Sequence, residues 1–170
     1  MPAALASLGY AFRHATQADA AFERILFETT RPDAAFLAAW PEATRRTFLD
    51  QQFHFQTVHY RRTYPQAFRG IVLAHHEPIG RLILDRAVEE WCMLDIALLP
   101  SWRGLGLGQA LIETIQAEAA QAEHPASITL MVDMSNPARR LYERLGFKAT
   151  AESMPNVVMA WYPTAQLKMA

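Results

Sequence analysis

A glycine-rich turn between an apolar run and an amphipathic stretch is the part of this chain best suited to chemistry. The apolar run ends at Pro100, and Arg103, Gly104, Gly106 and Gly108 follow it. Backbone N–H groups at a helix start have no partner within the helix, and the helix dipole adds positive charge there. Glycines let the backbone approach an anion because no Cβ intervenes. The pattern therefore predicts a strand, a phosphate-binding turn and a helix.

Two common phosphate motifs do not fit this turn. A nucleoside triphosphate loop needs Gly-x-x-x-x-Gly-Lys-Ser/Thr, whereas Gln109 and Ala110 follow Gly108 here. A dinucleotide fingerprint needs Gly-x-Gly-x-x-Gly, and the third glycine of this turn comes one position too early. The pattern that fits is Arg-x-x-Gly-x-Gly, at Arg103, Gly106 and Gly108.

A second segment combines an apolar, β-branched stretch, Ser127 to Val132, with helix signals directly after it. Asn136 is a good N-cap, and Pro137 suits the first position of a helix, where its missing N–H costs nothing. The apolar side chains share one helical face: Ala138, Leu141, Tyr142 and Leu145. Gly146 stands where a helix closes in the left-handed conformation, and Phe147 begins a new strand.

The two segments, taken in this order, resemble the two hallmark motifs of the GNAT superfamily of N-acetyltransferases. The glycine turn resembles the acetyl-CoA signature of that family. Asn-Pro-Ala-x-x-Leu-Tyr-x-x-x-Gly-Phe resembles the helix after its fifth strand. The likeness covers roughly residues 70 to 162 and thins toward the N-terminus. In the family's commonest form the asparagine lies one residue further from the tyrosine than Asn136 does, so a contact between Asn136 and the cofactor is left open.

The resemblance implies an α/β fold over residues 1–170 as a single domain. The sheet is expected to be GNAT-like, mixed and largely antiparallel, with helices on both faces and a splay between the fourth and fifth strands. We place that splay between Ile96–Leu98 and Ile128–Val132. The implied activity is an acetyl-CoA-dependent N-acetyltransferase whose acceptor is a primary amine of a small molecule, peptide or protein. The alternatives are an acyl-CoA-binding sensor or interaction module without turnover, and a transferase that uses a longer acyl group.

Acetyl-CoA is the cosubstrate that the resemblance implies, and three segments are expected to bind it. The pantetheine arm pairs with strand backbone, and backbone N–H groups there polarise the thioester carbonyl. The expected cofactor-binding residues are Ile96, Ala97, Leu98, Arg103, Gly104, Leu105, Gly106, Leu107, Gly108, Gln109, Asn136, Arg139 and Tyr142. By the same resemblance Tyr142 is the catalytic residue, as general acid or hydrogen-bond donor to the leaving sulfur. The alternative is that Tyr142 is a core aromatic residue.

The general base and the acceptor wall are left open by the residues. Counting by twos from Ile96 places Leu94 and Cys92 on one side of the strand and Asp95 and Met93 on the other, and a bulge would swap these sides. Glu90 could serve as base from the Cys92 side, and Asp95 could brace the turn. Further candidates on the long helix are His54, His59, Tyr60 and Tyr64. The expected substrate-binding residues are Gln56, His59, Tyr60, Cys92 and Leu94. Alternatively, the polar helix residues point to water and Cys92 is an inert thiol.

Apolar periodicity and turn signals predict the elements that carry these residues. The predicted strands are Tyr10–His14, Ile71–Ala74, Ile79–Asp85, Trp91–Leu99, Ser127–Val132 and Val157–Tyr162, the second and third forming a hairpin. A helix capped by Thr16 is expected to reach about Thr30. An irregular link, Arg31–Pro41, then leads to a long helix from Pro41 to Tyr64, ended by Pro65. The helix after the glycine turn buries the stripe Leu107, Leu111, Ile115 and Ala119.

Composition limits the remaining possibilities. The chain has 170 residues, 51% of them hydrophobic, and a formal net charge of −1, which gives no electrostatic footprint for nucleic acid or an anionic membrane. One cysteine excludes an intrachain disulfide, and the scattered histidines predict no metal site. Met1–Gly9 lacks the features of a signal peptide. We therefore expect a cytoplasmic protein, as a monomer or homodimer.

Overall fold

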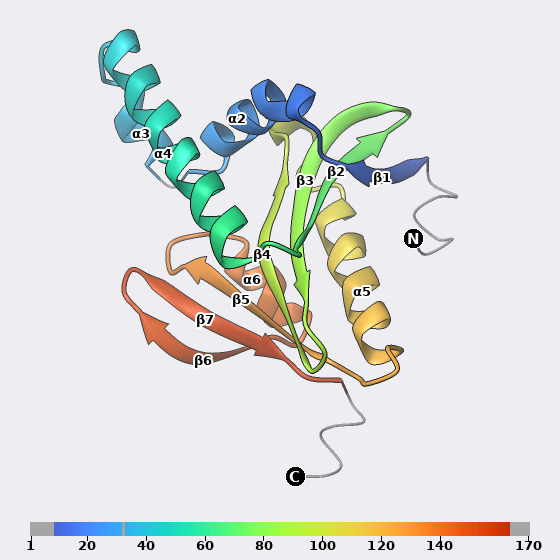
Figure 1. The fold of residues 1–170 in the computed structure, drawn as a ribbon. Coiled ribbons are helices and arrows are strands. Elements are labelled where there is room, and N and C mark those ends of the chain that lie inside the picture. The colour runs from blue at the N-terminus through green and yellow to red at the C-terminus, as the bar shows by residue number, and fades with distance from the viewer. Residues whose placement is uncertain (1–8, 32, 164–170) are drawn as a thin grey trace.

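The computed structural model describes residues 9–31 and 33–163 of the chain (Figure 1). Its strands are β1 (Tyr10–His14), β2 (Phe68–Ala74), β3 (Glu77–Arg86), β4 (Glu90–Leu98), β5 (Ser127–Asp133), β6 (Lys148–Ser153) and β7 (Asn156–Trp161). Its α-helices are α2 (Ala20–Thr29), α3 (Ala34–Leu37), α4 (Glu42–Thr63), α5 (Leu107–Ala120) and α6 (Arg139–Arg144), with 3-10 turns η1 (Gln17–Asp19) and η2 (Pro100–Trp102). The order follows the predicted one, except that α3 forms within the segment expected to be irregular.

All the strands lie in one sheet, in the order β1-β2-β3-β4-β5-β7-β6. Every neighbouring pair is antiparallel except β4 and β5, which run parallel. Parallel neighbours need a crossover connection, and α5 supplies it. The prediction of a mixed, largely antiparallel sheet is therefore confirmed.

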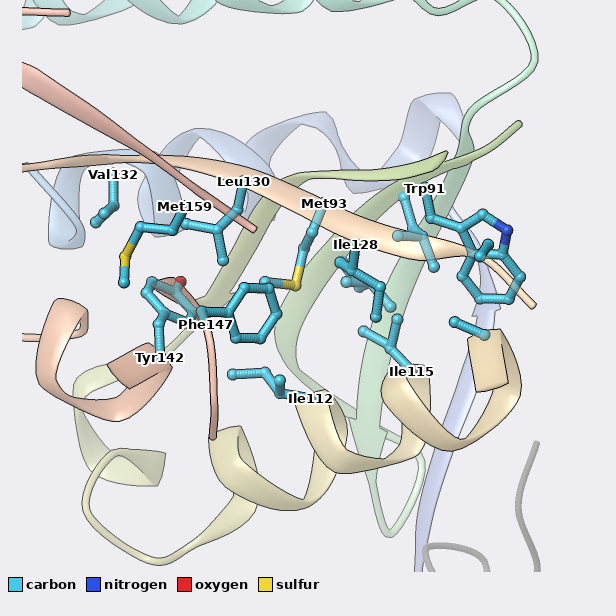
Figure 2. Packing of buried hydrophobic residues seen from close by; sticks show 14 of the residues in the cluster. Trp91, Met93, Ile112, Ile115, Ile128, Leu130, Val132, Tyr142, Phe147 and Met159 are labelled. Carbon is cyan, nitrogen blue, oxygen red and sulfur yellow. The ribbon is translucent and has the colours of Figure 1, made fainter. Parts of the chain in front are cut away.

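Helices cover both faces of the sheet (Figure 1). On one face α5 and α6 bury the main core, where Ile112 and Ile115 meet Met93, Ile128 and Phe147 (Figure 2). The predicted stripe of α5 is confirmed, because all four of its residues are buried. On the other face α2 contacts β3 and β4. The two faces thus serve different purposes: one is an apolar core, and the other carries polar groups described below.

The sheet opens between β4 and β5. Their parallel pairing covers only Glu90–Met93 against Ser127–Leu130, and no pair follows Met93 and Leu130. Beyond this point the two strands diverge (Figure 1). The predicted splay is confirmed, and it begins at the middle of β5 rather than at Ile128. The second half of β4 therefore has an unpaired edge on its β5 side.

A β-bulge interrupts β4 just where the opening begins. Ile83 pairs with Asp95 and Leu84 pairs with Met93, which leaves Leu94 without a partner in β3. The prediction from strict alternation, that the side chains of Asp95 and Cys92 lie on different sides of β4, is therefore wrong. The bulge residue Leu94 is skipped when the sides of the strand are counted. Cys92 and Asp95 share one side of β4, the side toward α2 and α4. Met93 turns to the other side, into the core of α5 and α6.

The long helix α4 begins and ends within a residue of its predicted limits. Leu49 is its one fully buried residue in the described chain, packed with Phe27 and Leu37 of α2 and α3. The helix leans away from the sheet at its N-terminal end, together with α3 (Figure 1). No helix in residues 9–31 and 33–163 is long and apolar enough to cross a membrane. The expectation about a leader falls on residues that, Gly9 excepted, lie outside the described ranges.

Candidate active site

The glycine turn after β4 presents free backbone N–H groups at the start of α5. Gly104 and Gly106 have φ values of +73° and +81°, a region that favours glycine. A Cβ built on either would meet no atom within 4 Å, so open space lies in front of the turn. Within the described part of the chain, no hydrogen bond is recorded from the N–H groups of residues 104–109. A nest of this kind suits an anion.

Arg103 ties this turn to two neighbouring elements. Its Nε donates to the carbonyl of Leu98 at 2.8 Å, at the end of β4. Its Nη2 donates to the carbonyl and hydroxyl of Thr29, at 3.1 and 2.9 Å, at the end of α2. Nη1 makes no recorded hydrogen bond among the described residues. Arg103 therefore positions the turn, and a phosphate contact through Nη1 stays a prediction.

Tyr142 lies in α6, with its ring buried and stacked edge-on to Phe147 at 5.8 Å between centroids (Figure 2). The helix begins at Arg139, later than the expected start at Pro137. The reason is that Asn136 Oδ1 accepts the N–H of Ala138 at 2.9 Å, which makes a turn before the first helical residue. The predicted end of this helix is confirmed, because Gly146 adopts the left-handed conformation with a φ of +84°.

The Tyr142 hydroxyl remains accessible although its ring is buried. No hydrogen bond is recorded for it, and no buried polar side-chain atom of the described residues lacks a partner, so the oxygen must reach solvent. Burial raises the pKa of Tyr142 to about 12, and the charge of Asp95 adds to the rise. Tyr142 comes from the α6 side of the sheet and Asp95 faces the other side, so the opening between β4 and β5 lets them interact.

Asp95 is held by Arg81, a residue that is only 4% exposed. Arg81 Nε donates to Asp95 Oδ2 at 2.6 Å, and Nη2 contacts the same oxygen. Arg81 Nη1 also pairs with Oε1 of Glu23 in α2 at 3.4 Å. A buried guanidinium needs such partners because an unpaired buried charge is very costly. Asp95 therefore braces β4 against β3, and not the glycine turn.

The family model of the acetyltransferase (GNAT) domain matches residues 67–149, which contain both motifs and the opening between β4 and β5. This stretch of the chain is therefore similar to the acetyltransferase domains of the GNAT family.

One curated relative is similar to part of this chain. The [ribosomal protein bS18]-alanine N-acetyltransferase of Haemophilus influenzae is 30% identical over 76 residues, which cover 45% of this chain and 51% of that protein. The chain thus spans about half the length of this curated relative.

Solved structures share the fold. The PaiA N-acetyltransferase of Thermoplasma acidophilum in complex with coenzyme A has a TM-score of 0.66 at 13% identity, covering 90% of this chain and 98% of that one. The ribosomal-protein-S18-alanine N-acetyltransferase of Escherichia coli has a TM-score of 0.58 at 20% identity, covering 90% and 93%. At such identities the likeness concerns the fold alone.

On the face of the sheet covered by α2 and α4, the helix α4 meets the bulge of β4. The Tyr60 hydroxyl donates to the carbonyl of Leu94 at 3.1 Å. Burial raises the pKa of Tyr60 to about 12, with a further contribution from Asp95. Burial also raises the pKa of the Cys92 thiol, which neighbours Tyr64. The structure thus brings together three of the predicted substrate-binding residues: Tyr60, Leu94 and Cys92.

The other expected residues of the acceptor side lie further out. His59 is exposed, with its ring 5.9 Å from that of Tyr60, and Gln56 is half-buried on the same helix. Glu90 accepts a hydrogen bond from Thr129 at 3.3 Å, at the paired end of β4 and β5. Glu90, one of the candidate bases, therefore lies away from the opening between β4 and β5.

A cavity of about 440 Å³ lies at the turn between β5 and α6. Its lining residues are Met134, Ser135, Asn136, Pro137, Arg139, Arg140 and Glu143. Two expected cofactor residues, Asn136 and Arg139, are therefore brought to one hollow surface. Arg139 Nε pairs with Glu143 at 2.9 Å, which fixes its side chain along α6.

Sequence reasoning missed Arg81 and Glu23. A weak signal for Arg81 existed, because it lies in the middle of an apolar strand, between Ile79 and Ile83, where a charged residue needs a buried partner. The partner itself could not be found without the register between β3 and β4. No group of histidine, cysteine or acidic residues within the described ranges could hold a metal ion.

Proposed function

We propose that this chain is an acetyl-CoA-dependent N-acetyltransferase acting on a primary amine of a small molecule, peptide or protein. The supporting observation is that β4 has an unpaired edge beyond Met93 and leads from there into a turn with free N–H groups, while the charge of Asp95 in this part of β4 contributes to the raised pKa of Tyr142. Acetyl transfer needs these three parts, for phosphates, thioester and leaving sulfur.

The turn and the strand edge divide the cofactor between them in this proposal. The N–H groups of residues 104–109 would bind the pyrophosphate, aided by the dipole of α5. The pantetheine amides would add to β4 along Ile96–Leu98, on the edge that β5 leaves unpaired. A neighbour of the same fold was solved with coenzyme A, in keeping with this assignment. Asn136 and Arg139 would contribute from the cavity beside α6.

Tyr142 would assist the departure of the thiolate. The amine nitrogen attacks the thioester carbonyl, the C–N bond forms, and collapse of the oxyanion breaks the C–S bond. Backbone N–H groups of β4 would stabilise the oxyanion. A phenol with a pKa of about 12 keeps its proton at neutral pH, so it is always available as a donor to the departing sulfur.

The acceptor is proposed only as a class. Relatives are named for acetylating an alanine of a ribosomal protein, and another neighbour is a spermidine N-acetyltransferase. All of these acceptors are amines. The chain's single cysteine suits a reducing compartment, so we place the reaction in the cytoplasm, by a monomer or homodimer.

A screen for thiol release tests the proposal. Purified protein with acetyl-CoA is offered amines, aminoglycosides, polyamines and peptides, and free CoA is read with a thiol reagent. We expect release that depends on at least one amine and yields an acetylated product by mass spectrometry. Tight binding of acetyl-CoA without release for any acceptor would instead favour an acyl-CoA sensor. Absence of binding would refute both functions.

A further inference from the structure

We propose that two copies of this chain form a symmetric homodimer through the outer face of α4, with the two α4 helices packed antiparallel. The outer face is defined by residues spaced three or four apart: Thr44, Thr47, Gln51, Phe55, Val58 and Arg62. Residues at this spacing lie on one side of a helix. The inference concerns assembly and does not depend on the proposed function.

The outer face of α4 carries large apolar side chains on the solvent side of the helix. The opposite side holds α4 to the protein, since Leu49 is buried there with Phe27 and Leu37. On the outer face, by contrast, Phe55 is 63% exposed and Val58 is 47% exposed. The N-terminal part of α4 also projects beyond the sheet (Figure 1). Large apolar side chains gathered on an exposed face mark an interaction surface.

A hollow of about 500 Å³ lies in the N-terminal half of the same face. Its lining residues are Trp40, Ala43, Thr44, Thr47, Phe48 and Gln51. Its wall is aromatic, because the Trp40 ring lies 5.4 Å from that of Phe48 and 5.8 Å from that of Phe36, between centroids. The outer face therefore has an aromatic hollow in its first half and two exposed apolar side chains in its second half.

The spacing of these residues makes the two halves complementary about Gln51. Phe55 follows Gln51 by four residues and Val58 follows it by seven. Thr47 and Thr44, at the hollow, precede it by the same four and seven residues. If two α4 helices cross antiparallel at Gln51, Phe55 of each copy lies opposite Thr47 of the other, and Val58 lies opposite Thr44. A two-fold interface needs a self-complementary patch of this kind.

The charges at the two ends of α4 favour the antiparallel direction. Arg61 and Arg62 at the C-terminal end have no recorded ion pair among the described residues, and neither has Glu42 at the N-terminal end. The antiparallel contact brings the basic end of each copy to the end of the other that carries Glu42 and the Trp40 ring. A carboxylate and an aromatic face both attract a guanidinium. A parallel contact would instead bring the arginines of both copies together, where they repel.

The size of the contact sets the expected affinity. One helix and the end of α3 form an interface at the small end of the specific ones, and interfaces of this size are weak. We therefore expect a dissociation constant of about 1–100 µM. An anionic membrane or a nucleic acid suits the face less well, because the whole chain has a formal net charge of −1.

Sedimentation velocity at about 1–200 µM protein tests the association. The parent chain should pass from monomer to dimer within this range. Phe55→Glu and Val58→Glu should each raise the dissociation constant by about tenfold or more, because they place a charge in the apolar contact. Both side chains are exposed in the single chain, so folding should be retained. Val88→Glu is the matched control, since it adds the same charge at an exposed valine between β3 and β4, and it should dimerise like the parent chain.

Cysteine cross-linking tests the register of the two helices. In a Cys92→Ser background, Gln51→Cys should form a disulfide between two copies when diamide is the oxidant, because residue 51 lies at the two-fold axis. Val58→Cys is the control from the same face of α4. Its two copies would lie about 21 Å apart along the helices, too far for a disulfide.

The outcomes separate the proposed dimer from the alternatives. A chain that stays monomeric over the whole range overturns the proposal, and so does a dimer that Phe55→Glu leaves unchanged, because another surface would then form it. A cross-link through Val58→Cys but not through Gln51→Cys overturns the antiparallel register. A monomer that binds vesicles of anionic lipid, and loses this binding in Phe55→Glu, would assign the outer face to a membrane instead. None of these results depends on transfer to an amine.

Discussion

Tyr142 combines a buried ring with an accessible hydroxyl. A substitution at this position can therefore remove the hydroxyl without disturbing the packing of the ring. The ring packs against Phe147 in the main core, whereas the oxygen has no recorded partner in the described chain. Packing and chemistry can therefore be separated at this residue. Few positions in the site allow this, since Arg103 and Asp95 both tie elements together as well.

We predict that Tyr142→Phe lowers kcat by about 10²- to 10⁴-fold while acetyl-CoA affinity is unchanged. The free energy of unfolding should change by less than about 0.5 kcal/mol, because no protein hydrogen bond is lost. Steady-state kinetics measures kcat, calorimetry measures acetyl-CoA affinity, and urea unfolding measures the free energy of unfolding. Tyr10→Phe is the matched control, since Tyr10 packs on Trp102 in a separate cluster. Equal turnover of both variants would make Tyr142 a core residue only.

The raised pKa of Tyr142 predicts how stability depends on alkaline pH. From pH 10 to about 12 the unfolded chain loses this phenolic proton while the folded chain retains it. The free energy of unfolding should therefore fall as pH rises through this interval, by up to about 1.4 kcal/mol per pH unit, and be unaffected by this group below pH 10. Urea unfolding at pH 9, 10 and 11 measures the slope. The slope should be shallower in Tyr142→Phe, and an identical slope would argue against the shift.

Among the elements, the glycine turn is the one whose backbone itself carries the proposed chemistry. Gly106 has positive φ and open space before it, whereas a Cβ on Gly108 would make ordinary contacts, 3.7 Å to Leu141 and 3.9 Å to Leu98. The two glycines thus differ in what they require. Gly106 serves the conformation of the turn, and Gly108 lies against the protein interior.

We predict that Gly106→Ala weakens acetyl-CoA binding by about tenfold or more. A left-handed conformation costs a non-glycine residue roughly 1–2 kcal/mol, so the turn would relax and its N–H groups would lose their common direction. Gly108→Ala should bind within about threefold of the parent chain. Isothermal titration with acetyl-CoA compares the two. Equal affinities for both variants would remove the turn from the cofactor site.

The elements also reveal how far the sequence alone could lead. The limits of α4 and the close of α6 were predicted well, because Pro65 and Gly146 act locally and at fixed positions. The helix α3 was missed, since four residues are too few to display a helical period. The bulge at Leu94 and the pair Arg81–Asp95 depend on the register between β3 and β4. Register is set by contacts between strands, so no local pattern contains it.

At the scale of the whole molecule, the sheet consists of two parts joined by a short parallel ladder. β1 to β4 form one part and β5, β7 and β6 the other, and the ladder between them stops at Met93 and Leu130. The core formed with α5 and α6 spans both parts. A ligand that adds to the free edge of β4 would therefore stabilise the whole folded chain rather than one part of the sheet.

We predict that acetyl-CoA at 100 times its dissociation constant raises the stability of the chain by about 2.7 kcal/mol, because it binds only the folded state. For a chain of this size that corresponds to a rise in Tm of roughly 5–10 °C. Differential scanning fluorimetry measures it, with ATP plus acetate as the control ligands. A comparable rise with the control would point to unspecific anion binding.

The bulge at Leu94 also bears on how such a strand can vary. In a regular strand, one inserted residue inverts the parity of every position after it, so core and surface side chains exchange places. Here the extra residue stands outside the ladder, so Cys92 and Asp95 share one side, and Met93 keeps its place in the core. Position 94 is thus free of the requirement, which applies to its neighbours, that each side chain alternate between core and surface. Evolution can alter the side chain there, and with it the selectivity of this side of the sheet, with little penalty to folding.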